Sequence, residues 1–255
     1  MITEQYLSLV SYILDKGEKR ETRNAPTASI FGATMRFNLI DDGFPILTCR
    51  KIFHEGIQGE FKAFIEDVST IKRFKHFGCN YWDKWADEEG NLTLDYPPRE
   101  QLNTVIELIK NDPTSRRIMI NLWDHKRLDK LSLPCCHFNY QFYVRDKEYL
   151  DMIWTQRSVD VAVGLPADLI LAALYTITIA NECRLQPGDI TMNFGDTHIY
   201  LDHVFDLLRM KQEYSVSKGR KINWKLDSGV LDFLPGDLQL LNYDTDNIIK
   251  FKLHG

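Results

Sequence analysis

The chain has 255 residues, of which 44% are hydrophobic and 26% are charged. This length and composition predict one sizeable hydrophobic core in a single catalytic domain spanning residues 1–255. The formal net charge of −5 argues against a broad surface for nucleic acid, although a few arginines can still bind a phosphate locally.

The chain contains five cysteines, at positions 49, 79, 135, 136 and 183. An odd number in a long chain indicates a reducing compartment rather than a disulfide framework, and none has the spacing of a zinc site. The N-terminus lacks the basic start and apolar block of a signal peptide, and no apolar run reaches the ~18 residues that a membrane-spanning helix needs. We therefore expect a cytoplasmic protein that binds neither a metal nor a membrane.

In the first half of the chain, apolar residues at helical spacing predict a helix over residues 2–16. Alternating patterns predict strands over 29–39 and 44–49. Residues 55–75 are expected to be helical. A further helix is predicted over 99–111, where Asn-Asp-Pro stops it.

In the second half, residues 167–183 are apolar on nearly all sides, which predicts a buried helix. A strand and turn are expected over 189–200, and a helix over 201–214. Further strands are expected at 116–123, 138–144 and 149–158. Together these elements predict an α+β fold with a mixed sheet and one central helix.

Two adjacent cysteines, Cys135 and Cys136, stand with His137 at the start of a predicted strand. One interpretation is burial, because free cysteine is among the most buried residue types. The other is a thiolate nucleophile held at the end of a strand.

Several arginines lie at loop and strand ends: Arg23, the adjacent pair Arg116 and Arg117, and Arg157, which precedes Ser158. The planar guanidinium suits phosphate, and a neighbouring hydroxyl adds a donor. These residues could together form a phosphate site. Taken singly, each could equally form a surface salt bridge.

Four further polar residues have two interpretations each. Asp168 lies near the start of the apolar helix, where it could cap the helix or present its carboxyl to a pocket. Glu60 lies on an amphipathic helix, where it could face solvent or be buried with a raised pKa. His198 and Tyr200 share one face of a strand, as a polar patch or as ligands of a sugar hydroxyl.

Five segments resemble the thymidylate synthase family in order and spacing: "YWDKWADEEGNL", "NDPTSRRI", "CHFNYQFYV", "QRSVDVAVGLPADL" and "GDTHIYLDH". The resemblance covers nearly the whole chain. It implies the thymidylate-synthase fold, with a mixed curved β-sheet, a buried central helix and surrounding helices. It also implies a homodimer that uses 5,10-methylenetetrahydrofolate to add one carbon to C5 of a pyrimidine nucleotide.

The resemblance also assigns roles to residues. Cys136 resembles the nucleophile, with Cys135 as a packing residue, and the arginines beside Cys136 are expected to lower its pKa. The other catalytic residues that it implies are Glu60, Asp168 and Tyr96. The nucleotide ligands are Arg23, Gln156, Arg157, Ser158, Asp168, His198 and Tyr200, with Arg116 and Arg117 donated by the partner subunit. The folate ligands are Arg50, Trp82, Trp85, Asp160 and Gly164.

The sequence departs from the family at Asp168, where a uracil-reading asparagine is usual. Cytosine presents an N3 acceptor and an amino donor, and a carboxyl kept neutral by its site can pair with both. This change resembles the family members that act on cytidylates, such as bacteriophage enzymes. The intact arginine pair and Ser158 favour dCMP over CMP.

A second departure concerns the product. The family's Tyr-Gly-x-x-Trp segment is reduced to "DYPPRE", and the small apolar tail is replaced by "FKLHG". Looser closure would let water attack the exocyclic methylene, which favours 5-hydroxymethyl-dCMP as the product. Leu133 resembles the methylating enzymes, so 5-methyl-dCMP stays an alternative. CMP hydroxymethylation, dUMP methylation and a non-catalytic RNA-binding role are further alternatives.

Overall fold

The computed structural model describes residues 1–214, 220–245 and 247–254. Its main sheet has six strands in the order β1-β2-β6-β5-β4-β3. Their bounds are β1 Glu18–Arg20, β2 Thr27–Asn38, β3 Met119–Asn121, β4 His137–Arg145, β5 Tyr149–Asp160 and β6 Gln186–Tyr200. Only β5 and β6 run parallel among these neighbours. The mixed sheet and the α+β class are confirmed.

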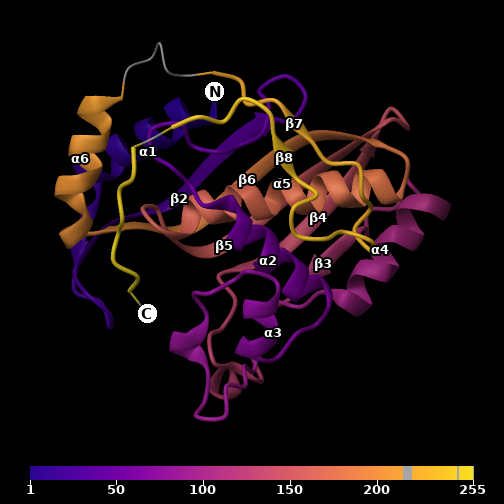
Figure 1. Cartoon of the computed structure of the whole chain (residues 1–255), viewed down its shortest axis with the longest axis horizontal. Helices are drawn as coiled ribbons and strands as arrows, with labels where there is room; N and C mark the ends of the chain where they lie inside the picture. Colours follow the sequence, from indigo (N-terminus) through magenta and orange to yellow (C-terminus); the bar gives the residue numbers. More distant parts are fainter. Residues whose placement is uncertain (215–219, 246, 255) are drawn as a thin grey trace.

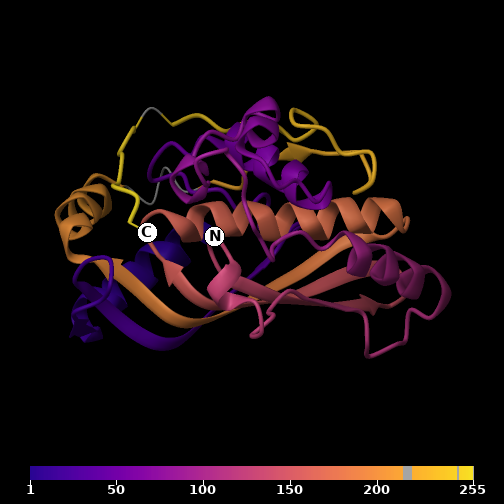
Figure 2. The same cartoon turned by 90° about the horizontal axis from the view of Figure 1, so that it is seen from below.

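The helices lie mainly on one face of this sheet, as Figures 1 and 2 show. Helix α5 (Gly164–Glu182) runs along the sheet, and α2 (His54–Ile65) packs on α5 from the other side. The other α-helices of the described residues are α1 Ile2–Lys16, α3 Ile71–His76, α4 Arg99–Asn111 and α6 Val204–Glu213. A separate pair of short strands, β7 Trp224–Lys225 and β8 Gln239–Leu240, follows them.

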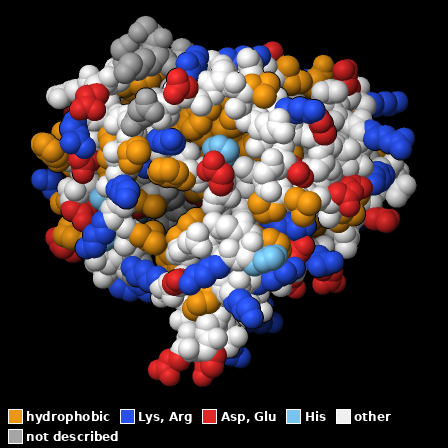
Figure 3. Space-filling model, in the orientation of Figure 1, with side chains coloured by type: hydrophobic (Ala, Val, Ile, Leu, Met, Phe, Trp, Pro, Cys, Tyr) orange, Lys and Arg blue, Asp and Glu red, His pale blue; other side chains and the backbone are white. Residues whose placement is uncertain are grey.

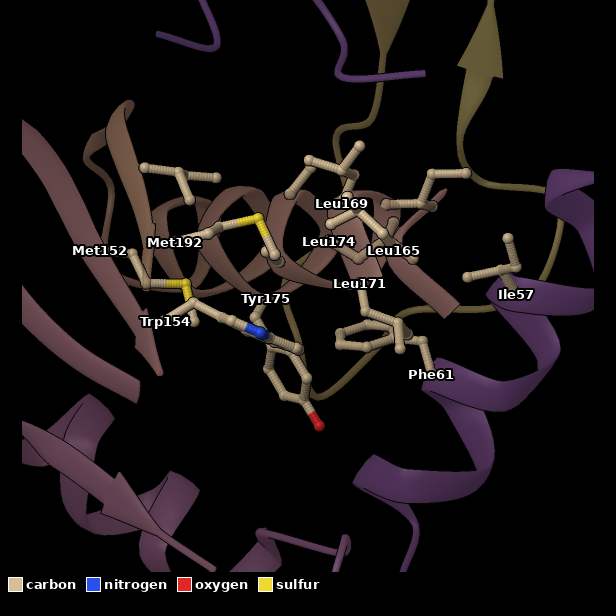
Figure 4. Close-up of a cluster of buried hydrophobic side chains, with 14 of the residues drawn as sticks. Ile57, Phe61, Met152, Trp154, Leu165, Leu169, Leu171, Leu174, Tyr175 and Met192 are labelled. Carbon is tan, nitrogen blue, oxygen red and sulfur yellow. The ribbon is translucent and has the colours of Figure 1, made fainter. Parts of the chain in front are cut away.

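The core lies between the sheet and α2, with α5 at its centre (Figure 4). The ring of Phe61 on α2 meets that of Tyr175 on α5 edge-on at 4.8 Å. On the sheet side, Trp154 stacks on Tyr140 with ring centroids 4.5 Å apart. Each large apolar side chain buried here stabilises the fold by roughly 1.5–3 kcal/mol. This packing holds α5 between α2 and the strands β5 and β6.

Helix α5 is long and apolar enough to cross a membrane by length and composition, contrary to the expectation that no such run exists. However, 83% of its apolar window is buried inside the protein. Its apolar residues therefore pack in the core, which explains why they occur on nearly every face of the helix.

Several predicted elements differ in the structure. Residues 44–49 form no strand, because Pro45 lacks a backbone N–H and the neighbouring apolar residues are all buried rather than alternating. The helix expected over 55–75 is two helices, and Asp67 between them has a left-handed φ of 56°. The strand expected over 116–123 shrinks to β3.

The turn expected within 189–200 is also wrong. Gly195 instead continues β6, which is one unbroken strand to Tyr200. Over much of the face drawn in Figure 3, lysine and arginine side chains are interspersed with acidic ones.

Candidate active site

A pocket of about 320 Å³ opens where β4, β5 and β6 meet the start of α5 and one face of α2. The predicted residues that line it are Arg23, Glu60, Trp82, Trp85, Tyr96, Cys136, Gln156, Arg157, Ser158, Asp160, Gly164, Asp168, His198 and Tyr200. The fold thus brings predicted residues from positions as far apart as 23 and 200 to the lining of one cavity. Arg50, Arg116 and Arg117 lie outside its lining.

Cys136 lies just before β4 and is partly exposed to the pocket, whereas Cys135 is fully buried. The backbone N–H of Cys136 donates to the Tyr96 hydroxyl at 2.9 Å, and that of Cys135 donates to the Asp95 carboxylate at 2.9 Å. Two consecutive residues of the 95–96 segment therefore fix the turn that aims one thiol into the pocket and the other into the core.

Arg157 places a cation beside the exposed thiol. Its guanidinium donates to the carbonyl oxygens of Cys135 at 2.8 Å and Pro134 at 2.9 Å, and its Nη2 lies 4.0 Å from the sulfur of Cys136. Burial nevertheless raises the pKa of the Cys136 thiol, and Arg157 only opposes that rise. Arg157 therefore lowers this pKa in the expected direction, but desolvation outweighs a single guanidinium and the net shift is upward.

Glu60 on α2 is buried and accepts two hydrogen bonds, from the Tyr81 hydroxyl at 2.8 Å and the Trp82 indole at 2.7 Å. Burial raises the pKa of Glu60 to about 7, although both hydrogen bonds lower it. A carboxyl with this pKa can accept and return protons near neutral pH. Sequence reasoning missed Tyr81, although it directly precedes Trp82.

Asp168 is the second buried acid of the pocket, on the first turns of α5. Its Oδ2 accepts a hydrogen bond from Gln156 Nε2 at 2.6 Å. Burial raises the pKa of Asp168 to about 7, and the nearby charge of Glu60 adds to the rise. The side chain contacts the pocket rather than capping the helix, since no side-chain cap is formed at the start of α5.

Further polar side chains line the pocket from β6 and from the loop before β2. The Nδ1 atom of His198 lies 2.9 Å from Asp196 Oδ1, and Tyr200 Oη accepts a hydrogen bond from Asn24 at 3.4 Å. Arg23 is exposed and donates to Asn24 at 3.2 Å. Asn24 escaped sequence reasoning because asparagine in a polar loop carries no distinctive pattern.

The C-terminal tail reaches the same end of the pocket through Leu253 and His254. The ring of His254 stacks on Tyr200 at 4.1 Å, and its Nε2 lies 3.0 Å from the Asp202 carboxylate. His203, Asp202 and His254 bring potential metal-ligand atoms within 4.8 Å of one another, but His203 Nε2 already donates to the Lys252 carbonyl at 3.0 Å. We therefore describe this cluster as the attachment of the tail.

Three predicted ligands lie elsewhere. Arg50 is buried, donates to the carbonyls of Ala162 and Ile249 and lies over the Phe251 ring at 4.9 Å. It ties the loop before α5 to the tail instead of lining the pocket. Arg116 and Arg117 are exposed in the turn before β3, and neither lines the pocket of its own chain.

The folate candidates differ in their surroundings. Asp160 accepts hydrogen bonds from the backbone of Ala162 and Val163 at 2.9 and 3.2 Å, and burial raises its pKa. The rings of Trp82 and Trp85 lie 5.2 Å apart. The lining of this pocket therefore offers a flat ligand both indole surface and an acidic hydrogen-bonding group.

The sequence from residue 4 to residue 254 matches the model of the thymidylate synthase family. The chain belongs to the thymidylate synthase family. Members of this family are homodimeric enzymes that transfer a one-carbon unit from methylenetetrahydrofolate to a pyrimidine nucleotide. Family membership places the chain in this class of folate-dependent transferases.

Proposed function

We propose that this enzyme is a deoxycytidylate hydroxymethylase, which converts dCMP, methylenetetrahydrofolate and water to 5-hydroxymethyl-dCMP and tetrahydrofolate. The observation that carries the proposal is Asp168, a buried carboxyl that faces the pocket. Its Oδ1 can donate a proton to cytosine N3 while Oδ2 accepts from the 4-amino group. A cytoplasmic location, where the five free thiols would stay reduced, fits this proposal.

In the proposed reaction, the thiolate of Cys136 attacks C6 of the base, and the resulting nucleophilic C5 forms a bond to the folate methylene carbon. Loss of the C5 proton releases tetrahydrofolate and leaves an exocyclic methylene. Water adds to this carbon, the C5–C6 double bond returns and the thiolate leaves. Glu60, whose pKa is raised to about 7, can relay the protons.

The remaining pocket residues support binding of the nucleotide. Arg23, Arg157 and Ser158 provide donors for the phosphate, and His198 and Tyr200 provide contacts for the sugar. We propose that Arg116 and Arg117 complete the phosphate site of the partner subunit, because neither lines the pocket of its own chain. Trp82, Trp85, Asp160 and Gly164 would contact the folate, with Arg50 acting through the tail.

Two features support water as the final nucleophile. The tail brings His254, a polar ring, into the lining of the pocket. The shortened "DYPPRE" segment leaves Tyr96 attached to the backbone of Cys136, with Phe64 stacked on its ring at 5.0 Å. Water held at a polar edge can reach the methylene carbon, whereas a fully apolar closure would exclude it.

A second candidate is a dCMP methylase, in which hydride from the folate reduces the methylene to a methyl group and leaves dihydrofolate. Leu133 lines the pocket and favours this alternative. Mass spectrometry of the product formed from dCMP and methylenetetrahydrofolate distinguishes the two. Release of tritium from C5 of dCMP tests for any C5 chemistry, and no release would indicate a binding protein instead.

The base preference provides the sharpest test of the proposed substrate. The Asp168→Asn substitution should lower kcat/KM for dCMP and raise it for dUMP, which moves their ratio by about tenfold or more. The amide no longer carries the acidic proton that cytosine N3 accepts. If Asp168 served only the helix, asparagine would replace it with little effect. An unchanged ratio would therefore remove the main support for a cytidylate substrate.

A further inference from the structure

The amide of Gln156 has a fixed orientation, and its neighbours show why. Trp154, two residues earlier on β5, donates its indole N–H to Gln156 Oε1 at 3.0 Å. An indole nitrogen can only donate, so the amide oxygen must face it. The Nε2 group then donates to Asp168 Oδ2 at 2.6 Å and to the Ser158 carbonyl at 3.1 Å.

The oxygen of the Gln156 amide therefore accepts one hydrogen bond, and its NH2 group donates two. Trp154 and Gln156 are both buried, at 0% and 2% exposed, so water cannot easily replace either contact. Trp154 is itself held between aromatic rings, stacked on Tyr140 at 4.5 Å and close to His137 at 4.4 Å. The indole cannot turn its N–H elsewhere without disturbing this packing.

The orientation of Gln156 has a consequence for Asp168. Oδ2 of Asp168 faces a donor, the Nε2 group of Gln156. In a neutral carboxyl the carbonyl oxygen is the better acceptor, so Oδ2 is favoured as the carbonyl oxygen. The hydroxyl is then favoured at Oδ1. A reversed Gln156 would present its oxygen to Asp168, attract the proton to Oδ2 and leave Oδ1 as an acceptor.

We propose that Trp154 is a specificity-determining positioning residue, because its indole N–H fixes Gln156 as a donor and so directs the proton of Asp168 toward the base. This inference rests on the proposed function for its choice of base. A hydroxyl at Oδ1 suits N3 of cytosine, which accepts, whereas a bare acceptor suits N3–H of uracil. Trp154 would thus affect which base is used without lining the pocket.

The test is the Trp154→Phe substitution, which keeps an aromatic ring in the stack and removes the indole N–H, the one donor to Gln156 Oε1 among the described residues. We expect the ratio of kcat/KM for dCMP to that for dUMP to fall by about tenfold, as for one mismatched buried hydrogen bond. A purely structural role would lower turnover of both nucleotides alike. An unchanged ratio would overturn the proposal.

Tyr140→Phe is the matched control. It removes a hydroxyl from the ring that stacks on Trp154, where that hydroxyl contacts His137, but it leaves the indole N–H in place. For Tyr140→Phe, the ratio of kcat/KM for dCMP to that for dUMP should equal the wild-type ratio. If Trp154→Phe does not fold, Gln156→Met removes the donor to Asp168 at nearly constant volume, and the same fall in the ratio is expected.

A measurement without substrate separates this proposal from the proposed function. Asp168 raises the pKa of Cys136, Tyr96 and Tyr140, the titratable groups packed near it. The hydrogen bond from Gln156 lowers the pKa of Asp168, whereas Glu60 and Asp160 raise it. Trp154→Phe should therefore raise the pKa of Asp168 in a carbon-13 NMR titration of its carboxyl. Tyr140→Phe should leave it unchanged.

The two proposals can then fail separately. A wild-type enzyme that prefers dUMP, together with a shifted Asp168 titration in Trp154→Phe, would refute the cytidylate assignment and support the positioning role. A wild-type enzyme that prefers dCMP, with neither the ratio nor the titration changed in Trp154→Phe, would support the assignment and overturn the positioning role.

Discussion

Two buried acids, Glu60 and Asp168, face the same pocket, and the charge of Glu60 contributes to the raised pKa of Asp168. Each has a pKa raised to about 7 by burial. Deprotonating one acid therefore makes it harder to deprotonate the other. At neutral pH the free pocket holds protons that an ordinary pair of carboxyls would have lost.

These protons predict a pH dependence of stability. The folded protein holds the Asp168 proton up to about pH 7, whereas the unfolded chain loses it near pH 4, so the group's contribution is lost as pH rises between these values. The loss amounts to at most roughly 4 kcal/mol. Compared with Asp168→Asn, the wild-type apoprotein should lose stability between pH 4 and 8, as measured by denaturant unfolding. If the free energy of unfolding varied with pH in the same way in both proteins, the raised pKa of Asp168 would be contradicted.

The adjacent thiols predict opposite outcomes for two small substitutions. Cys136→Ser should abolish turnover while nucleotide binding persists, because attack at C6 needs a thiolate but phosphate binding does not. Cys135→Ser should retain turnover and lose stability by roughly 1–3 kcal/mol, because it places a hydroxyl in the core. Calorimetric binding and steady-state rates measure both effects. Activity that survives in Cys136→Ser and disappears in Cys135→Ser would reverse the assignment.

Sequence could indicate the residues around this pocket because the segments that carry them end at the same edge of the sheet. Motif resemblance indicated Cys136 and Asp168 directly. It could not place Arg50, whose role depends on how the tail folds back, and it could not show that burial outweighs Arg157 at the thiol. Tyr81 and His254 contact the site through packing between segments distant in sequence, which no local pattern encodes.

Among the elements, the unit β5-α5-β6 contributes most of the proposed nucleotide ligands. Its parallel strands need a long connection, and α5 provides it across the core. Helix α5 was predictable from sequence because apolar residues occupy nearly all of its faces. The exact course of β6 was not predictable, since Gly195 lies within the strand and allows close packing against β5 rather than forming a turn.

The close packing at Gly195 is testable. A Cβ at this position would lie 2.6 Å from the carbonyl oxygen of Arg157 on the neighbouring strand. Gly195→Ala should therefore separate β6 from β5 near Arg157, reduce stability by roughly 1–3 kcal/mol and weaken nucleotide binding. Thermal unfolding and calorimetry measure these effects. Gly56→Ala, where the nearest atom is 3.5 Å away, is the control and should not lower stability.

At the scale of the whole molecule, one face of the sheet is left without helices among the described residues (Figure 2). A row of paired residues crosses this face: Met119, Gln141, Ile153, Thr191 and Arg36. Ile153 and Met119 are 42% and 39% exposed, and Arg116 borders a hollow of about 290 Å³ on the same face. Since family members are homodimers, we propose this face as the subunit contact.

Mixing inactive subunits tests the shared site. Cys136→Ser and Arg117→Ala chains should each be inactive alone, but a mixed dimer contains one pocket with an intact thiol and an intact partner arginine. Random exchange should restore about one quarter of wild-type activity, as measured after mild dissociation and reassociation. Exchange demonstrated by labelled chains without any recovery would show that each chain completes its own phosphate site.

The uncovered sheet face also affects how the enzyme behaves on dilution. If the arginines of one copy complete the pocket of another, the rate per chain depends on how many chains have met a partner. Specific activity would then fall as an assay is diluted below the dissociation constant of the pair, and progress curves started from dilute stock would show a lag. Nucleotide bound across both copies would slow the loss, so that substrate itself would help to keep the subunits together.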